Sequence, residues 1–395
     1  MLAESMQEGR FRSIQVAPVK PIVVVFGTFD LDGGRARTVC DAMRCLGWRL
    51  ETCHRRFWSG TAAKLGVFRA GAMLRTVGRA AVMYPFLVFR ALLHVPFDFM
   101  LICPGGFLDI CFGWIAARLT GATIIFDPLY GLWETIVEDR QLLSARSAPA
   151  KAVGLFERLC FRLADVVLVD TEDHVAYFLR QAGLSRRRII VVPVGAEDGL
   201  FYPRESDSHR RDSDGTNVLF YGSMIRLHGA DTIIRAAHKI GDPQIRFTLV
   251  GRGQMSEQVE SLARQLACRN VTFVPRVPYE TVPALIRNAD ICLGIFGTTQ
   301  KARDVVPTKV YQCLAMGKPV VTGDTPATRR LFESGKHLLT VPCGDADALA
   351  EAIVRLKNDS SLRESLGRAA KNLYSERFSA AALAQRLKPL EARIR

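Results

Sequence analysis

The stretch that decides the fold reads D-V-V-P-T-K-V-Y-Q-C-L-A-M-G-K-P-V-V-T-G and runs from Asp304 to Gly323. Pro307 and Thr308 predict the start of a short helix, because a threonine hydroxyl at the N-cap can accept a hydrogen bond from a backbone N–H of the first turn. Gly317 is expected to end this helix in the left-handed conformation, and a buried strand follows. A helix start presents N–H groups and a positive dipole end to an anion. With Lys309 in the first turn, the stretch predicts a phosphate site.

Length and composition indicate a well-packed globular protein. The chain has 395 residues, 49% of them hydrophobic and 23% charged, which is enough for two α/β domains. Its 10 cysteines form no C-x-x-C pair and no run with histidine at metal-ligand spacing. Reduced thiols in a cytosolic protein are therefore favoured over a disulfide framework, and no metal site is expected.

The charge calls for an acidic partner. The net charge is +14 and the isoelectric point is about 9.6, which suits nucleic acid, anionic lipid or a phosphorylated substrate equally well. The first ten residues carry two glutamates and no apolar core, so they do not resemble a signal peptide. The longest apolar run, Ala80 to Phe89, is far shorter than the roughly 20 residues of a membrane span. We expect a cytoplasmic protein without a transmembrane helix.

Residues 1–203 predict a first doubly wound domain on a parallel sheet. The run P-I-V-V-V-F-G at 21–27 is followed by a loop with Gly33 and Gly34 and by a helical pattern, which is the strand, loop, helix order of an α/β sheet. Further strands are expected at 98–103, 123–127, 165–170 and 189–194. Gly33 and Gly34 can bring backbone close to a ligand on the acceptor side of the site, although a plain turn fits the same residues.

The segment Asp127 to Arg140, D-P-L-Y-G-L-W-E-T-I-V-E-D-R, follows a predicted buried strand. Loops past the carboxyl ends of parallel strands hold substrates in such folds. Asp127, Glu134, Glu138 and Asp139 are therefore candidates for contacting an acceptor hydroxyl. A solvated helix face would explain the last three equally well.

A basic and aromatic stretch lies between Glu51 and Asp98, where the chain has no acidic residue. Its cations, interleaved with aromatic and aliphatic residues, are Arg55, Arg56, Lys64, Arg69, Arg75, Arg79 and Arg90. An interfacial helix on an anionic membrane and a core helix with a basic outer face fit the pattern equally. Nucleic-acid binding is a third reading of this stretch.

The second domain is expected at 204–375. Residues 203–217 are polar, free of aromatics and rich in turn residues, as domain linkers often are. The same strand, loop, helix order then restarts, with strands predicted at 218–221, 246–250, 271–274 and 291–296. Two successive α/β sheets imply a cleft between the domains.

Four motifs stand in a characteristic order over roughly residues 218–375: F-Y-G-S-M with H-G-A-D, L-V-G-R-G, R-V-P-Y-E-T-V-P and the stretch quoted first. Their order resembles the retaining nucleotide-sugar glycosyltransferases of family four. The N-terminal half is similar more loosely, through G-T-F-D and D-P-L-Y. The resemblance implies the GT-B fold, in which two Rossmann-like doubly wound parallel-sheet domains face a cleft. It also implies that 376–395 forms a helix packing back on the N-terminal domain.

The resemblance implies a donor site for a sugar on a nucleoside diphosphate. The family's two hallmark glutamates correspond to Asp304, near the transferred sugar, and Gln312, which can hydrogen-bond ribose without charge. Ser223 and His228 stand where relatives carry the diphosphate-binding Arg and Lys, so Arg226 and Lys309 are expected to supply the charge, although Arg226 also fits a solvated loop. The predicted donor-binding residues are Gly222, Arg226, His228, Gly229, Gly251, Arg276, Val277, Pro307, Thr308 and Gln312.

The catalytic residues implied are Asp304, Lys309 and Asp127. Positive charge at Lys309 would stabilise the leaving diphosphate. Many relatives have a histidine in the first domain where this chain has Phe126 and Asp127, so Asp127 is predicted to make the remaining polar contact. Gly33, Gly34 and Glu134 are assigned to the acceptor side, and neither a metal nor a cofactor is expected.

The sequence thus predicts a hexosyltransferase-like enzyme that acts with retention of configuration on a lipid-linked or polysaccharide acceptor. The basic stretch suggests a peripheral position on the inner face of the cell membrane. A non-catalytic GT-B scaffold subunit is the alternative, because Ser223, His228, Gln312 and Phe126 all depart from the family pattern. Nucleic-acid binding is not expected, since the charge is joined to no helix-turn-helix, finger or stacking motif.

Overall fold

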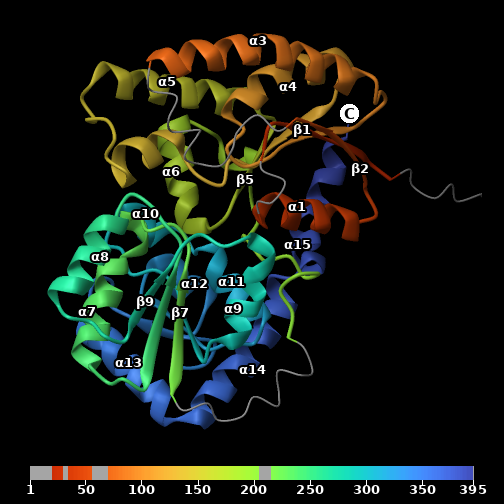
Figure 1. Cartoon of the computed structure of the whole chain (residues 1–395). Coiled ribbons are helices and arrows are strands. Elements are labelled where there is room, and N and C mark those ends of the chain that lie inside the picture. The colour runs from red at the N-terminus through yellow and green to blue at the C-terminus, as the bar shows by residue number, and fades with distance from the viewer. Residues whose placement is uncertain (1–19, 30–33, 56–69, 204–214, 395) are drawn as a thin grey trace, which may run out of the picture.

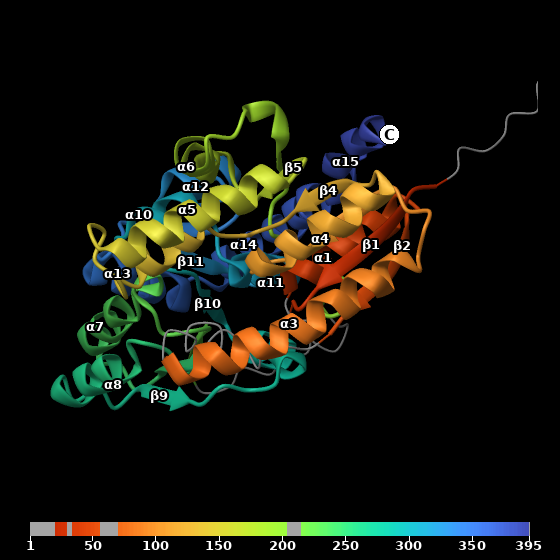
Figure 2. The ribbon, with the colours of Figure 1, turned by 90° about the horizontal axis from the view of Figure 1, so that it is seen from above.

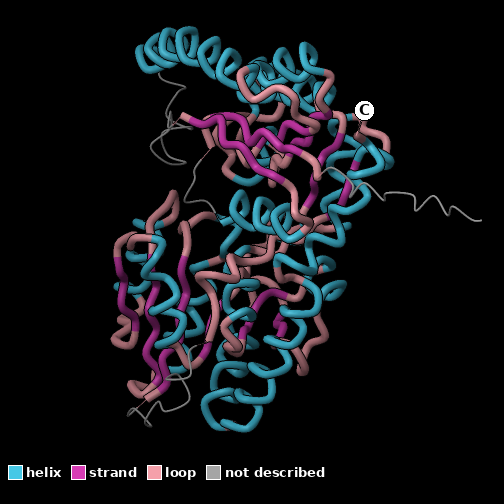
Figure 3. Tube along the Cα trace, turned by 90° about the vertical axis from the view of Figure 1, so that its right-hand side faces the viewer, coloured by secondary structure: helices cyan, strands magenta, loops and turns pink. Residues whose placement is uncertain are grey.

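The computed structural model describes residues 20–29, 34–55, 70–203 and 215–394, which form two parallel sheets wrapped by helices (Figure 1). Figure 3 shows the strands gathered in two groups, each with its own helices. This arrangement is the predicted GT-B architecture of two Rossmann-like layers, and the fold prediction is confirmed.

The first sheet has the parallel order β2-β1-β3-β4-β5-β6. Its strands are β1 (Ile22–Gly27), β2 (Arg49–His54), β3 (Phe99–Ile102), β4 (Thr123–Phe126), β5 (Val166–Val169) and β6 (Ile189–Val191). The β-branched run of β1 is buried on both faces, as a central parallel strand requires. Val23 and Val25 pack into one core layer, and Val24 and Phe26 into the other. Alternation along the strand thus divides its side chains between the two helical layers.

Helices cover both faces of this sheet. They are α1 (Gly34–Cys45), α3 (Ala70–Leu92), α4 (Phe107–Thr120), η2 (a π-helical turn, Glu134–Asp139), α5 (Ala148–Leu163), α6 (Glu172–Ala182) and η3 (Arg186–Arg188). In the view from above, α3, α4 and α5 lie across one face as an outer layer (Figure 2), and α4 packs against both of its neighbours. The layer is a surface of the molecule, away from the second sheet.

The second sheet has the parallel order β12-β11-β10-β7-β8-β9. Its strands are β7 (Thr216–Tyr221), β8 (Ile245–Val250), β9 (Val271–Val274), β10 (Ile291–Leu293), β11 (Val320–Gly323) and β12 (Leu339–Val341). The strand order reverses between β7 and β10. In doubly wound folds, ligands bind beyond the carboxyl ends of the strands at such a switch point.

The remaining helices surround the second sheet and then return to the first. They are η5 (Arg226–His228), α7 (Ala230–Ile240), α8 (Ser256–Gln265), η6 (Tyr279–Thr281), α9 (Val282–Asn288), α10 (Gln300–Asp304), α11 (Thr308–Ala315), α12 (Pro326–Leu331), α13 (Ala346–Asn358), α14 (Ser360–Arg377), α15 (Ala380–Leu387) and η7 (Lys388–Arg393). After α14 the chain crosses back, and α15 packs on α1 and β6. Leu383 and Leu387 of α15 complete the core layer beneath α1.

Several predicted features lie outside the described residues. The domain boundary placed at 203/204 falls beside the segment 204–214, and Gly33, Arg56, Lys64 and Arg69 are also outside. Within the described part of the chain, no helix has the length and apolar character needed to cross a bilayer.

Candidate functional site

A pocket of about 740 Å³ lies at the carboxyl ends of β7 and β8, where the second sheet faces the first domain. Its lining comprises Arg140, Leu142, Tyr221, Gly222, Ser223, Ile225, Val250, Gly251, Arg252, Gly253, Gln254, Arg276, Val277, Tyr279 and Val282. Gly222, Gly251, Arg276 and Val277, predicted from widely separated motifs, are thus brought together. The volume suits a nucleotide-sized ligand.

Two glycines form the floor of this pocket by close backbone contact. Gly222 and Gly251 have φ angles of 137° and 123°, a region that side chains of L-residues rarely adopt. A Cβ on Gly251 would lie 2.2 Å from the carbonyl oxygen of Gly222. Both positions therefore require glycine, and their backbone is exposed to whatever enters the pocket.

Lys309 lies directly behind Gly222. Its Nζ is 3.1 Å from the position that a Cβ of Gly222 would take, and 3.9 Å from the centroid of the Phe220 ring. The side chain is buried, and its Nζ has no hydrogen-bond partner among the residues that the structure describes. Burial lowers the pKa of Lys309 to about 7. The amine of Lys309 is therefore buried next to the pocket without an anionic partner.

His228 stands beside Lys309 but contributes no charge. Its Nδ1–H donates to the backbone carbonyl of Ser223. Burial, and then the positive charge of Lys309, hold the pKa of this imidazole well below its usual value. The ring is therefore a neutral wall near the floor of the pocket.

Arg226 and Gly229 lie outside the lining of this pocket. Arg226 is exposed on η5 and is not part of the pocket lining. Gly229, at φ 61°, would place a Cβ 2.5 Å from the backbone carbon of Phe296, so glycine is needed there for packing between loops. Packing thus explains the glycine, and the donor-binding role of Gly229 stays a prediction.

The helix that follows Pro307 begins as predicted, but its cap differs. α11 runs from Thr308, the N-cap is Pro307, and no side chain caps the helix. The expectation that the Thr308 hydroxyl caps the first turn is therefore wrong. Gly317 ends the region at φ 66°, in the left-handed conformation that was predicted.

Gln312 is held between two tyrosines. Tyr221 Oη donates to Gln312 Oε1 at 2.8 Å, and Gln312 Nε2 donates to Tyr279 Oη at 2.7 Å. Tyr279 in turn donates to Glu197 Oε2 at 2.6 Å. Both polar atoms of the buried amide are thus engaged within the protein, and a ribose contact of Gln312 stays a prediction that would use its remaining N–H or lone pair. Tyr279 also lines the pocket.

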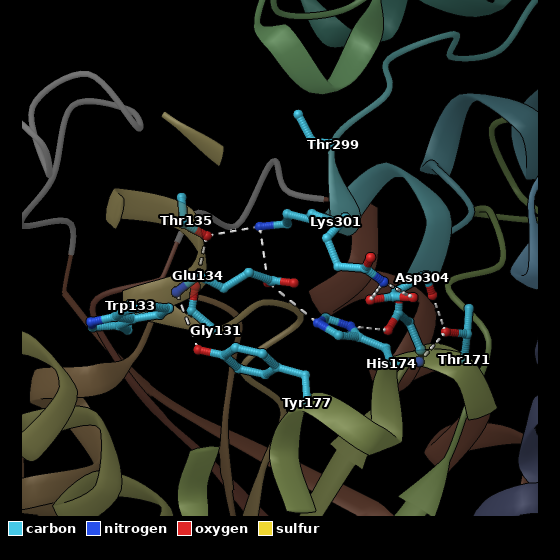
Figure 4. Close-up of polar contacts among 12 residues, drawn as sticks. Gly131, Trp133, Glu134, Thr135, Thr171, His174, Tyr177, Thr299, Lys301 and Asp304 are labelled. Carbon is cyan, nitrogen blue, oxygen red and sulfur yellow. Dashed lines mark hydrogen bonds and ion pairs between the residues drawn. The ribbon is translucent and has the colours of Figure 1, made fainter. Parts of the chain in front are cut away.

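Asp304 ends α10 at the contact with the first domain (Figure 4). Its half-buried carboxylate accepts from Gln300 Nε2 at 3.0 Å on both oxygens. Its backbone carbonyl accepts a short hydrogen bond from the hydroxyl of Thr171, which begins α6. Contacts between the two domains therefore fix the position of the predicted sugar-side carboxylate.

A buried charge cluster crosses the same contact (Figure 4). Lys301 of α10 reaches Glu134 Oε2 at 3.4 Å and donates to Thr135 Oγ1 at 2.8 Å, while His174 lies 3.3 Å from Glu134 and 2.7 Å from Asp170. Burial opposes these charges, yet Lys301 and His174 lower the pKa of Glu134 to about 2. Against the same burial, Asp170 and Glu134 raise the pKa of His174 to about 10. Glu134 is thus a buried ion-pair member, and the reading of a solvated helix face is wrong for it.

Asp127 forms a second buried ion pair. Arg35 Nε donates to Asp127 Oδ2 at 2.8 Å, and Arg35 Nη2 contacts Oδ1 at 3.3 Å. Arg35 also donates to the backbone carbonyls of Val192 and Pro193. With both carboxylate oxygens occupied by Arg35 and about 1% of the residue exposed, the geometry corrects the predicted acceptor contact of Asp127 to a structural role.

Gly34 begins α1 at the boundary between the domains. A Cβ at this position would lie 2.8 Å from Tyr279 Oη of the second domain. The glycine therefore permits the close approach of the two domains near the pocket.

Sequence reasoning missed Arg140, His174, Tyr279 and Lys301. The backbone N–H of His174 donates to Thr171 Oγ1 at 3.1 Å, in the spacing of an ordinary helix N-terminus. A buried histidine four residues after Asp170 was the available signal. The other three depend on how the two domains meet, which no local pattern encodes.

Two family models together cover most of the chain. "Glycosyl transferase 4-like domain" matches residues 32–195, and "Glycosyl transferases group 1" matches residues 202–373. Both the order of the two matches and the GT-B fold agree with the predicted family. The chain belongs to the family-four type of glycosyltransferases.

Curated relatives match over part of their length. The alpha-D-kanosaminyltransferase of Streptomyces kanamyceticus is 26% identical over 58% of this chain and 61% of its own. The phosphatidyl-myo-inositol mannosyltransferase of Mycobacterium leprae is 34% identical over 38% of this chain and 39% of its own. The chain thus spans between about one third and two thirds of the curated relatives that it matches.

Solved structures agree over nearly the whole fold. Sucrose-phosphate synthase from Thermosynechococcus elongatus aligns with a TM-score of 0.70 at 19% identity, covering 95% of this chain and 98% of that one. Anabaena HepE in complex with UDP-glucose aligns with a TM-score of 0.68 at 17% identity, covering 95% and 99%. At these identities the likeness establishes the fold.

Proposed function

We propose that the protein transfers a sugar from a nucleoside-diphosphate donor to a lipid-linked or polysaccharide acceptor, with retention of anomeric configuration. The observation that carries the proposal is Lys309, a buried cation without a partner at the switch point of the donor-side sheet. The complex of HepE with UDP-glucose supports a nucleotide sugar as the donor class.

In this reaction the bond from the anomeric carbon to the diphosphate oxygen breaks, and the electron pair stays on the diphosphate. Lys309, close behind Gly222, would stabilise the negative charge that develops there. Asp304, anchored by Thr171 and Gln300, would lie on the sugar side. The acceptor oxygen then forms a new bond to the anomeric carbon on the same face of the sugar, and its proton passes to the leaving diphosphate oxygen. Protein charges would suffice for the leaving group, so we propose that the reaction needs no metal.

The experiment that tests the proposal is thermal stabilisation by nucleoside diphosphates and their sugar conjugates, with magnesium or with a chelator. A ligand that binds the native state raises the melting temperature in proportion to the logarithm of its concentration over its dissociation constant. We expect a shift with diphosphates of one base, and a larger one with one sugar conjugate. Equal shifts with and without magnesium are expected if protein charges alone hold the diphosphate.

The scaffold alternative predicts a different result. If a folded protein gives no shift with any donor, the replacements at Ser223, His228 and Gln312 have removed donor binding, and the proposed function is wrong. Transfer should further depend on Lys309 and Asp304 if the protein is an enzyme. Cellular function that survives Lys309→Ala and Asp304→Ala would favour the scaffold.

We also propose that the acceptor is reached at an anionic membrane, through the outer layer formed by α3, α4 and α5. Apolar side chains between 42% and 77% exposed follow helical spacing on this layer; they are Val82, Phe86, Phe89, Leu93, Ile115, Leu119, Leu155 and Leu159. Val82, Phe86 and Phe89 of α3 recur at intervals of four and three residues, which places them on one side of the helix, and Leu93 follows directly after its end. An exposed apolar stripe of this size is typical of an interaction surface.

Charge on the same three helices has one sign wherever it is exposed. The acidic residues on their described parts, Asp109 and Glu157, are both buried. The exposed charged residues are basic: Arg79, Arg118, Lys151, Arg158 and Arg162. Cations beside an apolar stripe match the headgroups and acyl boundary of an anionic bilayer.

Sedimentation with liposomes tests this position. The protein is expected to pellet with vesicles containing phosphatidylglycerol and to stay in the supernatant with pure phosphatidylcholine. Replacing the exposed Phe86 and Phe89 by serine should weaken pelleting at least tenfold, since each loses part of the roughly 1.5–3 kcal/mol of a buried phenylalanine. Val354→Ser, at an exposed apolar position of α13, is the matched control. Wild type that stays in the supernatant with anionic vesicles would contradict the proposal.

A further inference from the structure

The pocket lacks one of the two cations that the sequence predicted for the diphosphate. Lys309 supplies one charge, but His228 is neutral and Ser223 carries none. Arg226, the expected second cation, is exposed on η5 outside the pocket lining. Arg252 and Arg276 also line the pocket, but both side chains are exposed, and two phosphates next to one buried cation would be poorly compensated.

Arg140 of the first domain lines this pocket, together with its neighbour Leu142. The Nε of Arg140 is buried and has no hydrogen-bond partner among the described residues. Its guanidinium is close enough to His228, on the far side of the cleft, to lower the pKa of that imidazole further. A buried arginine donor without an acceptor therefore faces the pocket, and the Nζ of Lys309 lies behind Gly222 in the floor of that pocket.

The segment that carries Arg140 is held against the second domain at both ends. At its start, Lys301 binds Glu134 and Thr135 of η2. At its end, Gln254 Nε2 donates to the backbone carbonyl of Arg140 at 3.1 Å. Gln254 belongs to the loop after β8, so Arg140 is fixed directly above the loops that contain Gly222 and Gly251.

We infer that Arg140 supplies the second positive charge for the donor diphosphate, so that the donor site is completed across the cleft by the first domain. The inference rests on the proposed function, because it requires a diphosphate in the pocket. A guanidinium presents several N–H donors in a plane and suits phosphate oxygens well. Donor binding would then favour the arrangement in which Lys301 and Gln254 hold the two domains together.

Calorimetric titration of the full chain tests the inference. The ligands are UDP, GDP, ADP and dTDP, followed by the nucleoside of the base that binds most tightly, at millimolar concentration. Arg140→Met should weaken binding of that diphosphate roughly 10- to 100-fold, the range of a charge-assisted hydrogen bond, and leave nucleoside binding unchanged within about twofold. Arg140→Lys should recover part of the loss.

Arg146→Met is the matched control, since Arg146 is an exposed arginine six residues along the same chain segment. It should bind the diphosphate like wild type. Equal diphosphate affinity in wild type and Arg140→Met would overturn the inference, as would an equal loss of diphosphate and nucleoside binding. A folded wild type that binds none of the four diphosphates would instead contradict the proposed function itself, and with it the inference.

Discussion

Buried charges are paired at the carboxyl edge of the first sheet, whereas a buried amine is unpaired at the carboxyl edge of the second sheet. At the first sheet, Arg35 neutralises Asp127, and His174 lies between Asp170 and Glu134. At the second sheet, the Nζ of Lys309 has no hydrogen-bond partner among the described residues, and neither has the Nε of Arg140, which the first domain contributes to the adjoining pocket.

The ion pairs of the first edge need no ligand, although Asp139 Oδ1 and Glu197 Oε1 of the first domain are also buried without a hydrogen-bond partner among the described residues. At the second edge it is the amine of Lys309 that has no partner. A buried unpaired cation destabilises a fold, so it is retained where function uses it. The comparison indicates that the first edge is mainly structural and that the second is built to receive an anion.

The largest change in unfolding free energy is expected from breaking the Arg35–Asp127 ion pair at the carboxyl edge of the first sheet. Asp127→Asn leaves the buried guanidinium of Arg35 without a counter-charge and should cost about 3–5 kcal/mol of unfolding free energy, measured by urea denaturation. Asp41→Asn removes an exposed carboxylate that pairs with Arg44 and should cost at most about 1 kcal/mol. Comparable losses in the two variants would remove the distinction between the paired edge and an ordinary surface pair.

A gain in unfolding free energy is expected at the carboxyl edge of the second sheet, where Lys309 has no partner. Lys309→Met removes a buried amine without a partner and should raise the unfolding free energy of the ligand-free protein by roughly 1–3 kcal/mol. Transfer should fall about 100- to 1,000-fold, because charge on the leaving diphosphate is no longer stabilised. Melting temperature and initial rates check the two effects. A variant that is both less stable and fully active would show that Lys309 is a structural residue.

A smaller effect is expected where the chain departs from the family hallmark. Gln312→Glu restores a carboxylate but removes the donor to Tyr279, whose hydroxyl proton is already given to Glu197. We expect a loss of about 1–3 kcal/mol in unfolding free energy and no gain in donor affinity. Gln265→Glu, on the exposed side of α8, should change stability by less than about 0.5 kcal/mol. Tighter donor binding in Gln312→Glu would mean that the amide does face the ribose.

Much of the fold was predictable because central parallel strands are continuous apolar runs. β1, β4 and β5 are buried on both faces and were recognised, whereas the edge strands β2 and β12 were missed. β2, R-L-E-T-C-H, is half exposed, and β12 has three residues, so neither gives a continuous apolar signal. The short α10 was missed for the same reason of length.

The candidate site was predictable only within the second domain. Gly222 and Gly251 follow strands that the sequence marks clearly, and Lys309 begins a helix that a proline and a glycine delimit. Arg140 and Tyr279 enter through the packing of the two domains, to which no spacing along the chain corresponds. The sequence also does not show hydrogen-bond partners. Gln312 and Asp127 are polar candidates for ligand contacts, yet both side chains form hydrogen bonds within the protein.

The number of protons taken up on diphosphate binding tests whether Lys309 is the cation that binds the donor diphosphate. Burial lowers the pKa of Lys309 to about 7, from 10.5 for an exposed lysine, so at pH 8 the amine of the free protein is mostly neutral. A bound diphosphate favours the charged amine, so binding should take up a proton and weaken as the pH rises above 7.

The measurement is calorimetric titration with the nucleoside diphosphate that stabilises the protein, at pH 8, in two buffers of different ionisation enthalpy. At this pH the terminal phosphate, with a pKa of about 6, is already deprotonated. We predict uptake of close to one proton per diphosphate by wild type and of none by Lys309→Met. Binding to wild type without proton uptake, or equal uptake by both proteins, would contradict the assignment of Lys309 as the cation that binds the donor diphosphate.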